Sequence, residues 1–188
     1  MPSVQTRRFT RAEYDRLIAQ GFFDEDEPIE LLDGLLVVKE PQGSRHVTVA
    51  GLVRTALEQA FGPRFHVRSA SPIALDATSE PEPDLAVVRG RLRDYLDAHP
   101  STPVLVAEVS QSSLASDRLW KARLYARAGL KEYWIVNIVD EVLEVYRQPV
   151  RAAGRPWTYR SVRLLRRGAV VRPLAAPRAR IRVADLLP

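Results

Sequence analysis

The spacing of apolar positions predicts three principal helices. Residues 9–21 form a short amphipathic pattern that begins at the capping residue Thr10 and ends at Gly21. Residues 44–62 repeat apolar side chains near helical spacing, and Gly62-Pro63 ends that helix. The positions expected to pack in it are Val47, Leu52, Val53, Leu57 and Phe61.

The third helix is predicted over 117–129. Ser116 or Asp117 is expected to cap it and Gly129 to end it. Its expected packing positions are Leu119, Leu124 and Tyr125. A smaller helix is predicted within 91–100, and the acidic residues 24–27 are expected to form a solvated loop.

Strand patterns fill most of the remaining chain. Residues 29–40 alternate around Asp33-Gly34, a strong signal for a β-hairpin. The unbroken apolar run in 103–110 is typical of a buried strand, and 132–138 followed by 140–147 predicts a second hairpin. Further strand-like segments are 65–69, 72–76, 83–90, 157–165, 169–174 and 180–187.

This order of elements predicts an α/β (α+β) fold, in which helices flank a mixed central β-sheet. The hairpin lies N-terminal to the sheet, and a β extension closes the chain. We expect one domain over residues 1–188, with a core at about 29–147 and a basic extension at about 148–188, because 188 residues fit a single domain and no long linker interrupts them.

Charge is distributed unevenly along the chain. From Arg147 to the end there are 11 arginines and one acid, Asp185, a local net charge of +10 in a chain whose net charge is +5. A basic surface joined to an acidic body suits a polyanionic partner. Codon bias is the alternative, because only three of the 28 basic residues are lysines.

Cysteine is absent, which excludes disulfides and Cys-based zinc sites. The sequence shows no apolar segment of signal-peptide or membrane-spanning length. These features lead us to expect a cytoplasmic protein that does not act in a membrane.

Two carboxylates stand beside apolar strands. Asp84 follows Pro83 at the start of one strand, and Glu108 lies inside the buried run of another. A buried carboxylate is costly unless a cation or hydrogen-bond donors meet it. If the two acids converge, they form an oxygen-rich site suited to Mg²⁺ or Mn²⁺. Alternatively, Asp84 caps a turn and Glu108 pairs with an arginine.

Lys121, on the following helix, is a candidate third member. Its ammonium could steady an attacking water or the charge that builds on a phosphoryl group. Lysine is conspicuous here because the chain otherwise uses arginine almost everywhere, and arginine cannot act as so compact a donor. The alternative is an ordinary solvated helix lysine.

Several stretches resemble the PD-(D/E)XK, restriction-endonuclease-like superfamily, and more narrowly its bacterial Uma-type family. The resemblance runs from about Glu13 to the end of the chain. The stretches that carry it are IELLDGLLVV, SRHVTVAGLVRTAL, PEPDLAVV, LVAEVSQSS, DRLWKARLYARAGLKEYWIVN and RIRVADLLP.

The resemblance implies that Asp84 and Glu108 are metal ligands. The superfamily lysine would fall two residues after the second acid, where this chain has Ser110, and Lys121 matches the lysine that similar family members place on the next helix. Glu30 and His46 match family positions too, implying an additional ligand and a group that contacts water or phosphate. From the residues alone, Glu30 could equally face solvent and His46 could be a capping or surface histidine.

The expected function is therefore that of a Mg²⁺- or Mn²⁺-dependent endonuclease that hydrolyses phosphodiester bonds of DNA. A homodimer is an expectation that such folds suggest. The alternatives are a catalytically silent protein that binds nucleic acid or another partner, and a nuclease for RNA or branched DNA.

Overall fold

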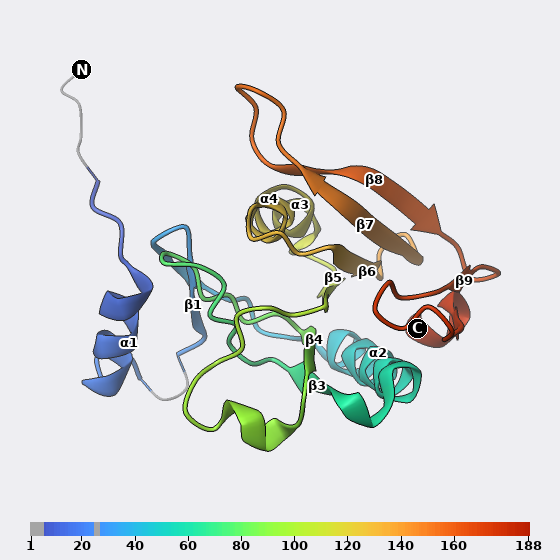
Figure 1. Cartoon of the computed structure of the whole chain (residues 1–188), viewed down its shortest axis with the longest axis horizontal. Coiled ribbons are helices and arrows are strands. Elements are labelled where there is room, and N and C mark those ends of the chain that lie inside the picture. Colours follow the sequence, from blue (N-terminus) through green and yellow to red (C-terminus); the bar gives the residue numbers. More distant parts are fainter. Residues whose placement is uncertain (1–5, 25–26) are drawn as a thin grey trace.

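The structure, a computed structural model, describes residues 6–24 and 27–188. A six-stranded sheet in the order β3-β4-β5-β6-β7-β8 forms its centre, and every neighbouring pair is antiparallel except β5 and β6. The strands are β3 (Phe65–Ser69), β4 (Leu85–Arg89), β5 (Leu105–Ser110), β6 (Glu132–Asn137), β7 (Val142–Val150) and β8 (Thr158–Leu165). The expected mixed sheet flanked by helices is confirmed (Figure 1).

Helices cover both faces of this sheet. One face carries α2 (Ser44–Phe61), and the other carries a continuous helical segment made of α3, a π-helical turn and α4. The bounds of that segment are α3 (Leu114–Ser116), the π turn (Asp117–Lys121) and α4 (Ala122–Arg127). It joins β5 to β6, as a parallel pair requires a crossover.

Alternation along β5 assigns its side chains to the two faces. Leu105, Ala107 and Val109 pack with α2, whereas Val106 packs with α4. Because successive side chains in a strand point to opposite faces, Glu108 and Ser110 share the face of Val106. This register directs both polar side chains toward the α3–α4 segment.

The N-terminal part packs beside the sheet. Helix α1 (Arg11–Ala19) begins at Thr10 with a capping box to Glu13, and Gly21 has the positive φ of 65° that the expected helix end requires. Strands β1 (Ile29–Leu32) and β2 (Leu35–Val38) form the expected hairpin.

Positive φ at both Asp33 and Gly34 makes the hairpin turn type I′. A Cβ at Gly34 would also lie 2.8 Å from the backbone oxygen of Phe9, so the N-terminal segment approaches too closely for any other residue.

The C-terminal part belongs to the same core. Strand β8 completes the central sheet, and β9 (Val170–Val171) pairs with β10 (Ile181–Arg182). Side chains of β9, β10 and the 3₁₀ turn η4 (Val183–Leu186) pack in the cluster beneath α2. Two further 3₁₀ turns are η1 (Gly62–Arg64) and η2 (Leu92–Tyr95), the latter within the predicted small helix.

Several local predictions are wrong. Residues 72–76 form no strand, although Ile73 is buried, because the segment makes single loop hydrogen bonds instead of a ladder. The third helix begins at Leu114, and its N-cap is Ser113, so neither Ser116 nor Asp117 caps it. Part of the acidic segment 24–27 lies outside the described residues.

The predicted packing stripes are also partly misplaced. Val47, Leu52 and Leu119 are exposed, whereas Val53, Leu57, Phe61, Leu124 and Tyr125 are buried as expected and Val49 joins them. In α2 the buried positions follow i, i+4, i+8 and i+12 from Val49, a narrower stripe than the one predicted. No helix in the described part of the chain is long and apolar enough to cross a bilayer.

Two valines of α2 provide a matched test of this packing. Val53 is fully buried and Val47 is 55% exposed. Replacing Val53 by alanine should lower the free energy of unfolding by about 2 kcal/mol, through reduced burial and a residual cavity. Val47→Ala should change it by less than about 0.5 kcal/mol. Urea unfolding followed by circular dichroism measures both, and similar losses in the two variants would contradict the assigned faces.

Candidate active site

Asp84 and Glu108 meet where β4 and β5 adjoin. Asp84 immediately precedes β4, and the register Leu85↔Ala107 places it opposite Glu108. The backbone N–H of Asp84 donates to Glu108 Oε2 at 3.2 Å, and the N–H of Val109 donates to Asp84 Oδ2 at 2.7 Å. Each acid is therefore fixed by the other's strand, and the expected convergence of the two carboxylates is present.

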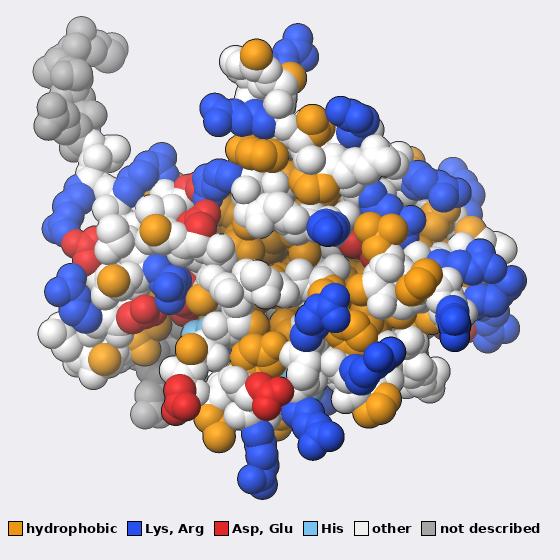
Figure 2. Space-filling model, in the orientation of Figure 1, with side chains coloured by type: hydrophobic (Ala, Val, Ile, Leu, Met, Phe, Trp, Pro, Cys, Tyr) orange, Lys and Arg blue, Asp and Glu red, His pale blue; other side chains and the backbone are white. Residues whose placement is uncertain are grey.

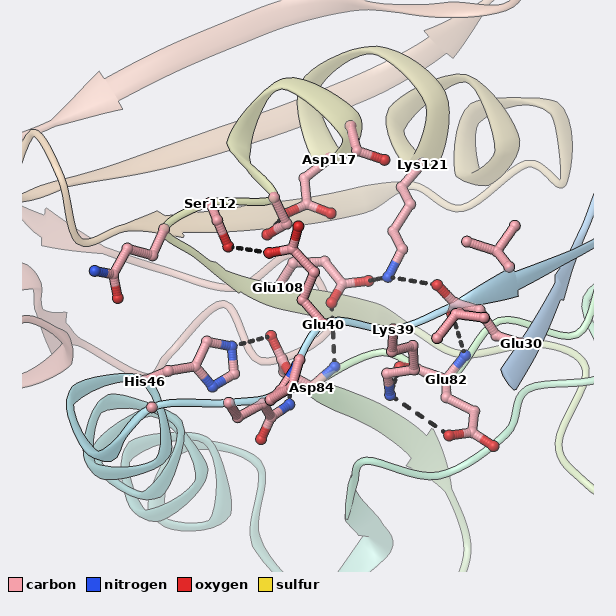
Figure 3. Close-up of a pocket in the computed structure, with 18 residues that line it drawn as sticks. Glu30, Lys39, Glu40, His46, Glu82, Asp84, Glu108, Ser112, Asp117 and Lys121 are labelled. Atoms are coloured by element: carbon pink, nitrogen blue, oxygen red, sulfur yellow. Dashed lines mark hydrogen bonds and ion pairs between the residues drawn. The ribbon is translucent and has the colours of Figure 1, made fainter. Parts of the chain in front are cut away.

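Lys121 approaches these two acids from the α3–α4 segment, which covers this face of the sheet. Its Nζ lies 3.2 Å from Glu108 Oε1 and 3.3 Å from Glu30 Oε1, so the ammonium stands between the two carboxylates (Figure 3). The side chain is only 11% exposed. The solvated alternative for Lys121 is thus wrong, and the partner of Glu108 is a lysine and not an arginine.

The π turn positions Lys121. The N–H of Ala122 donates to the carbonyl of Asp117, an i→i+5 bond, whereas the N–H of Asp117 still donates to Ser113 in the α-helical i→i+4 pattern. Single π turns of this kind are rare in helices and often lie at functional sites. Asp117, Lys121 and Tyr125, spaced four residues apart, all face the sheet from this segment.

Ser110, which occupies the place of the superfamily lysine, secures this helix to β5. Its hydroxyl donates to Asp117 Oδ2 at 2.6 Å, and the hydroxyl of Ser113 donates to the same oxygen at 2.7 Å. Burial raises the pKa of the Asp117 carboxyl, although Lys121 and the two hydroxyl groups oppose that shift. The strand and the lysine-bearing helix are therefore joined by a buried carboxylate.

His46 and Glu30 belong to the same pocket. His46, in the first turn of α2, lies with Nε2 3.1 Å from Asp84 Oδ2, and Gln42 donates to Asp84 Oδ1 at 3.0 Å. Glu30, on β1, is buried, and its Oε2 accepts the backbone N–H of Glu82 at 2.9 Å. A solvent-facing Glu30 and a purely superficial His46 are therefore both excluded.

Electrostatics differ among these groups. Burial raises the pKa of the Glu108 carboxyl above its ordinary value, with Lys121 opposing the shift. For Asp84 burial acts in the same direction, but His46, the backbone N–H of Val109 and the charge of Lys121 together outweigh it and lower the pKa. The bond to Asp84 in turn raises the pKa of His46. Burial lowers the pKa of Lys121, yet Glu108 and Glu30 more than compensate and keep it charged.

The donor set fits a hard divalent cation. Glu30, Asp84, Glu108 and Asp117 all line a cavity of about 290 Å³ together with His46 and Lys121. Glu40, Glu82 and Lys39 also line this cavity, so six acids face two lysines and one histidine, and negative charge is in excess. Carboxylate oxygens are the ligands that Mg²⁺ and Mn²⁺ prefer. Within residues 6–24 and 27–188, however, no three acid or histidine side chains are already arranged as a metal site. Glu30 in particular is separated from Glu108 by the Lys121 ammonium.

Some members of the site are not evident from the sequence. The sequence predicts only a packing role for Tyr125, but its hydroxyl donates to Glu108 Oε1 at 2.9 Å. Asp117 is considered only as a helix cap, and Gln42 is not singled out. The four-residue spacing of Asp117, Lys121 and Tyr125 is the signal that could have revealed the first two. The hydrogen bond from Gln42 depends on a loop conformation and leaves no such signal.

The buried charge arrangement can be tested through stability. Lys121→Met should destabilise the protein by about 3–5 kcal/mol near neutral pH, because it leaves buried acids without their cation. Ionising a carboxyl whose pKa is raised by folding costs stability as pH increases, and losing Lys121 raises the pKa of Glu108 further. The loss should therefore be smallest in acid, where Glu108 is protonated, and grow with pH.

Lys131→Met is the matched control, since Lys131 is exposed just after the same helical segment. It should change the free energy of unfolding by less than about 0.5 kcal/mol at any pH. Urea titrations at a series of pH values measure both variants. A Lys121→Met loss that is small, or that does not depend on pH, would refute the described ion pairs.

The structure and the sequence were compared with those of known proteins. The structure is similar to that described as "a putative nuclease belonging to DUF820" from Anabaena variabilis ATCC 29413, with a TM-score of 0.67 and 15% identity over 95% of this chain and 97% of that one. The type IIG restriction endonuclease BpuSI aligns with 66% of this chain, which spans only 14% of its own length, at 16% identity and a TM-score of 0.39. No match was found among curated proteins. The model of the Uma2 family, described as "Putative restriction endonuclease", matches residues 11–184, and the chain therefore belongs to that family.

Proposed function

We propose that the protein is a metal-dependent endonuclease that hydrolyses phosphodiester bonds of DNA. The observation that carries the proposal is the pairing of Asp84 and Glu108 from adjoining strands, with the Lys121 ammonium held beside them in one cavity. Membership of a restriction-endonuclease family supports the same reaction class.

Asp84 and Glu108 would hold a Mg²⁺ or Mn²⁺ ion. When bound, such an ion lowers the pKa of water and stabilises charge on a scissile phosphate. Glu30 is the third proposed ligand, and it would reach the ion once Lys121 no longer stands between it and Glu108. Until then, Glu30 acts as a counter-ion that keeps Lys121 charged.

Lys121 would neutralise the negative charge that develops on the phosphoryl group, or hold the attacking water. Its ammonium is suited to this because its pKa is kept high, so it remains a cation and a hydrogen-bond donor. His46 would keep Asp84 oriented and ionised, and contact water or phosphate at the cavity. Tyr125 and the backbone N–H of Asp84 fix the Glu108 carboxylate in place.

Nicking of supercoiled plasmid DNA in Mg²⁺ or Mn²⁺ tests the proposal. Asp84→Asn and Glu108→Gln should each reduce the rate by about a hundredfold or more, since each removes a charge that the ion requires. Glu58→Gln is the control, because Glu58 is an exposed acid on α2 whose partner is Arg54. It should cleave like the wild type.

A second readout follows metal binding without cleavage. Mn²⁺ should raise the melting temperature of the wild type and of Lys121→Gln, but not that of Asp84→Asn. Lys121→Gln should nonetheless lose nicking activity.

If the wild type cleaves neither duplex DNA, branched DNA nor RNA in the presence of metal, a silent nuclease-fold protein is the better description. Cleavage of RNA or branched DNA alone would correct the substrate. A homodimer, in which two sites would act on two strands, stays a prediction for sedimentation measurements.

A further inference from the structure

The C-terminal arginines remain to be explained, because the pocket uses none of them. Among the 11 arginines from Arg147 onward, Arg147, Arg167 and Arg182 form ion pairs with acids. The other eight are exposed, and none is within ion-pair distance of an acid in the described part of the chain. They are Arg151, Arg155, Arg160, Arg163, Arg166, Arg172, Arg178 and Arg180.

These side chains lie on or next to the edge strand β8 and the β9–β10 pair. They come from the turn between β7 and β8, from β8 itself and from the segments around β9 and β10. Figure 2 shows arginine and lysine side chains crowding the side of the molecule that carries β8, β9 and the C-terminal segment. Like charges gathered without counter-ions repel one another, so the arrangement favours a bound polyanion.

A small cup lies within this surface. Strands β7, β8 and β9 enclose about 220 Å³, and Arg147, Arg163 and Arg172 stand around an apolar floor that includes Val171. Arg147 is neutralised by Glu132, at 2.5 Å, and also donates to the carbonyl of Arg172 at 2.6 Å. The cup therefore has a fixed side and two unpaired guanidinium groups, which match the paired oxygens of a phosphate.

The arginine surface also meets the rim of the catalytic pocket. Glu141 accepts from Arg167, which follows β8, at 3.1 Å and lies 3.4 Å from Arg45, the neighbour of His46 on α2. Glu141 is thus paired with an arginine on each side, which offsets its charge where the arginine surface adjoins α2.

We propose that the C-terminal arginine surface, with the cup between Arg163 and Arg172, binds the phosphate backbone of nucleic acid independently of sequence. It extends the proposed function, but it does not depend on cleavage or on a metal. Nucleic acid is favoured over an acidic protein because duplex DNA presents one negative charge per roughly 1.7 Å of helix axis, a regular array that suits arginines spread over several strands.

Binding of the full chain to a short fluorescent DNA duplex, measured by anisotropy in EDTA at several salt concentrations, tests the proposal. Arg163→Gln/Arg172→Gln should weaken binding roughly tenfold at moderate salt. It should also reduce the slope of log K against log salt by about 2, one unit for each phosphate that an arginine no longer neutralises.

Arg64→Gln/Arg93→Gln is the matched control. These two arginines are exposed, form no ion pair with any described residue and lie at the other end of the sheet, near β3. The control removes the same charge and should leave the slope unchanged. Equal effects of the two double variants would show that only net charge matters, and would overturn the proposal. If the melting temperature of the first variant falls, Arg160→Gln/Arg166→Gln replaces it and carries the same expectation.

Competition identifies the ligand. Unlabelled duplex should displace the probe at far lower phosphate concentration than inorganic phosphate does, because single ions do not form an array. Displacement by polyglutamate at an equal concentration of charge would overturn the assignment to nucleic acid. Because all binding is measured without metal, a failure of nicking leaves this result intact. Conversely, if the wild type nicks DNA normally but Arg163→Gln/Arg172→Gln binds duplex DNA as tightly as the wild type, only the present inference is overturned.

Discussion

The arrangement of the site depends on one buried carboxylate. Glu108 lies inside the central sheet, where an ion without partners would cost several kcal/mol. Its two oxygens accept from Lys121, Tyr125 and the backbone of Asp84. Lys121 and Tyr125 belong to the continuous α3–α4 segment and Asp84 to the chain that leads into β4, so satisfying a single acid holds both segments against β5.

The strand register determines which segments these are. Because Glu108 and Ser110 are two residues apart on the strand, their side chains point to the same helix. There Lys121 bonds to Glu108 and Asp117 bonds to Ser110, and these two partners are four residues apart on the helix. Two periodicities, that of the strand and that of the helix, are therefore matched through hydrogen bonds. The opposite face of β5 stays apolar and packs with α2, which in turn brings His46 to Asp84.

Much of this could be anticipated from the sequence. The unbroken apolar run of β5, the Asp33-Gly34 turn and the Thr10 cap are local signals, and each is present in the structure. Asp84, Glu108 and Lys121 stand out in the sequence because charged groups beside apolar segments require partners. Family resemblance adds Glu30 and His46, whose own sequence context is equally consistent with solvent exposure.

What the sequence does not reveal depends on tertiary context. A π turn arises from one displaced hydrogen bond, and nothing in the composition of 117–121 announces it. The predicted helix start at Ser116 or Asp117 is also wrong, and the prediction assigns Leu119 to the wrong face. The role of Tyr125 is hidden because a tyrosine at a packing position looks the same whether or not its hydroxyl meets an acid. In the apparent strand at 72–76, Ile73 and Leu75 are buried, but the segment has no ladder partner.

The position of the lysine on a helix changes how the site holds together. A lysine at the place of Ser110 would share a strand with Glu108, and the sheet alone would assemble acids and ammonium. With Lys121 on the crossover segment, the sheet fixes the two acids, but the ammonium reaches them only when that segment is docked. Leu124, Tyr125 and Ala126 of the same segment are buried in the core cluster on this face of the sheet. The packing that stabilises this face therefore also completes the site, so a substitution that weakens the docking of the helix would displace the ammonium without touching either acid.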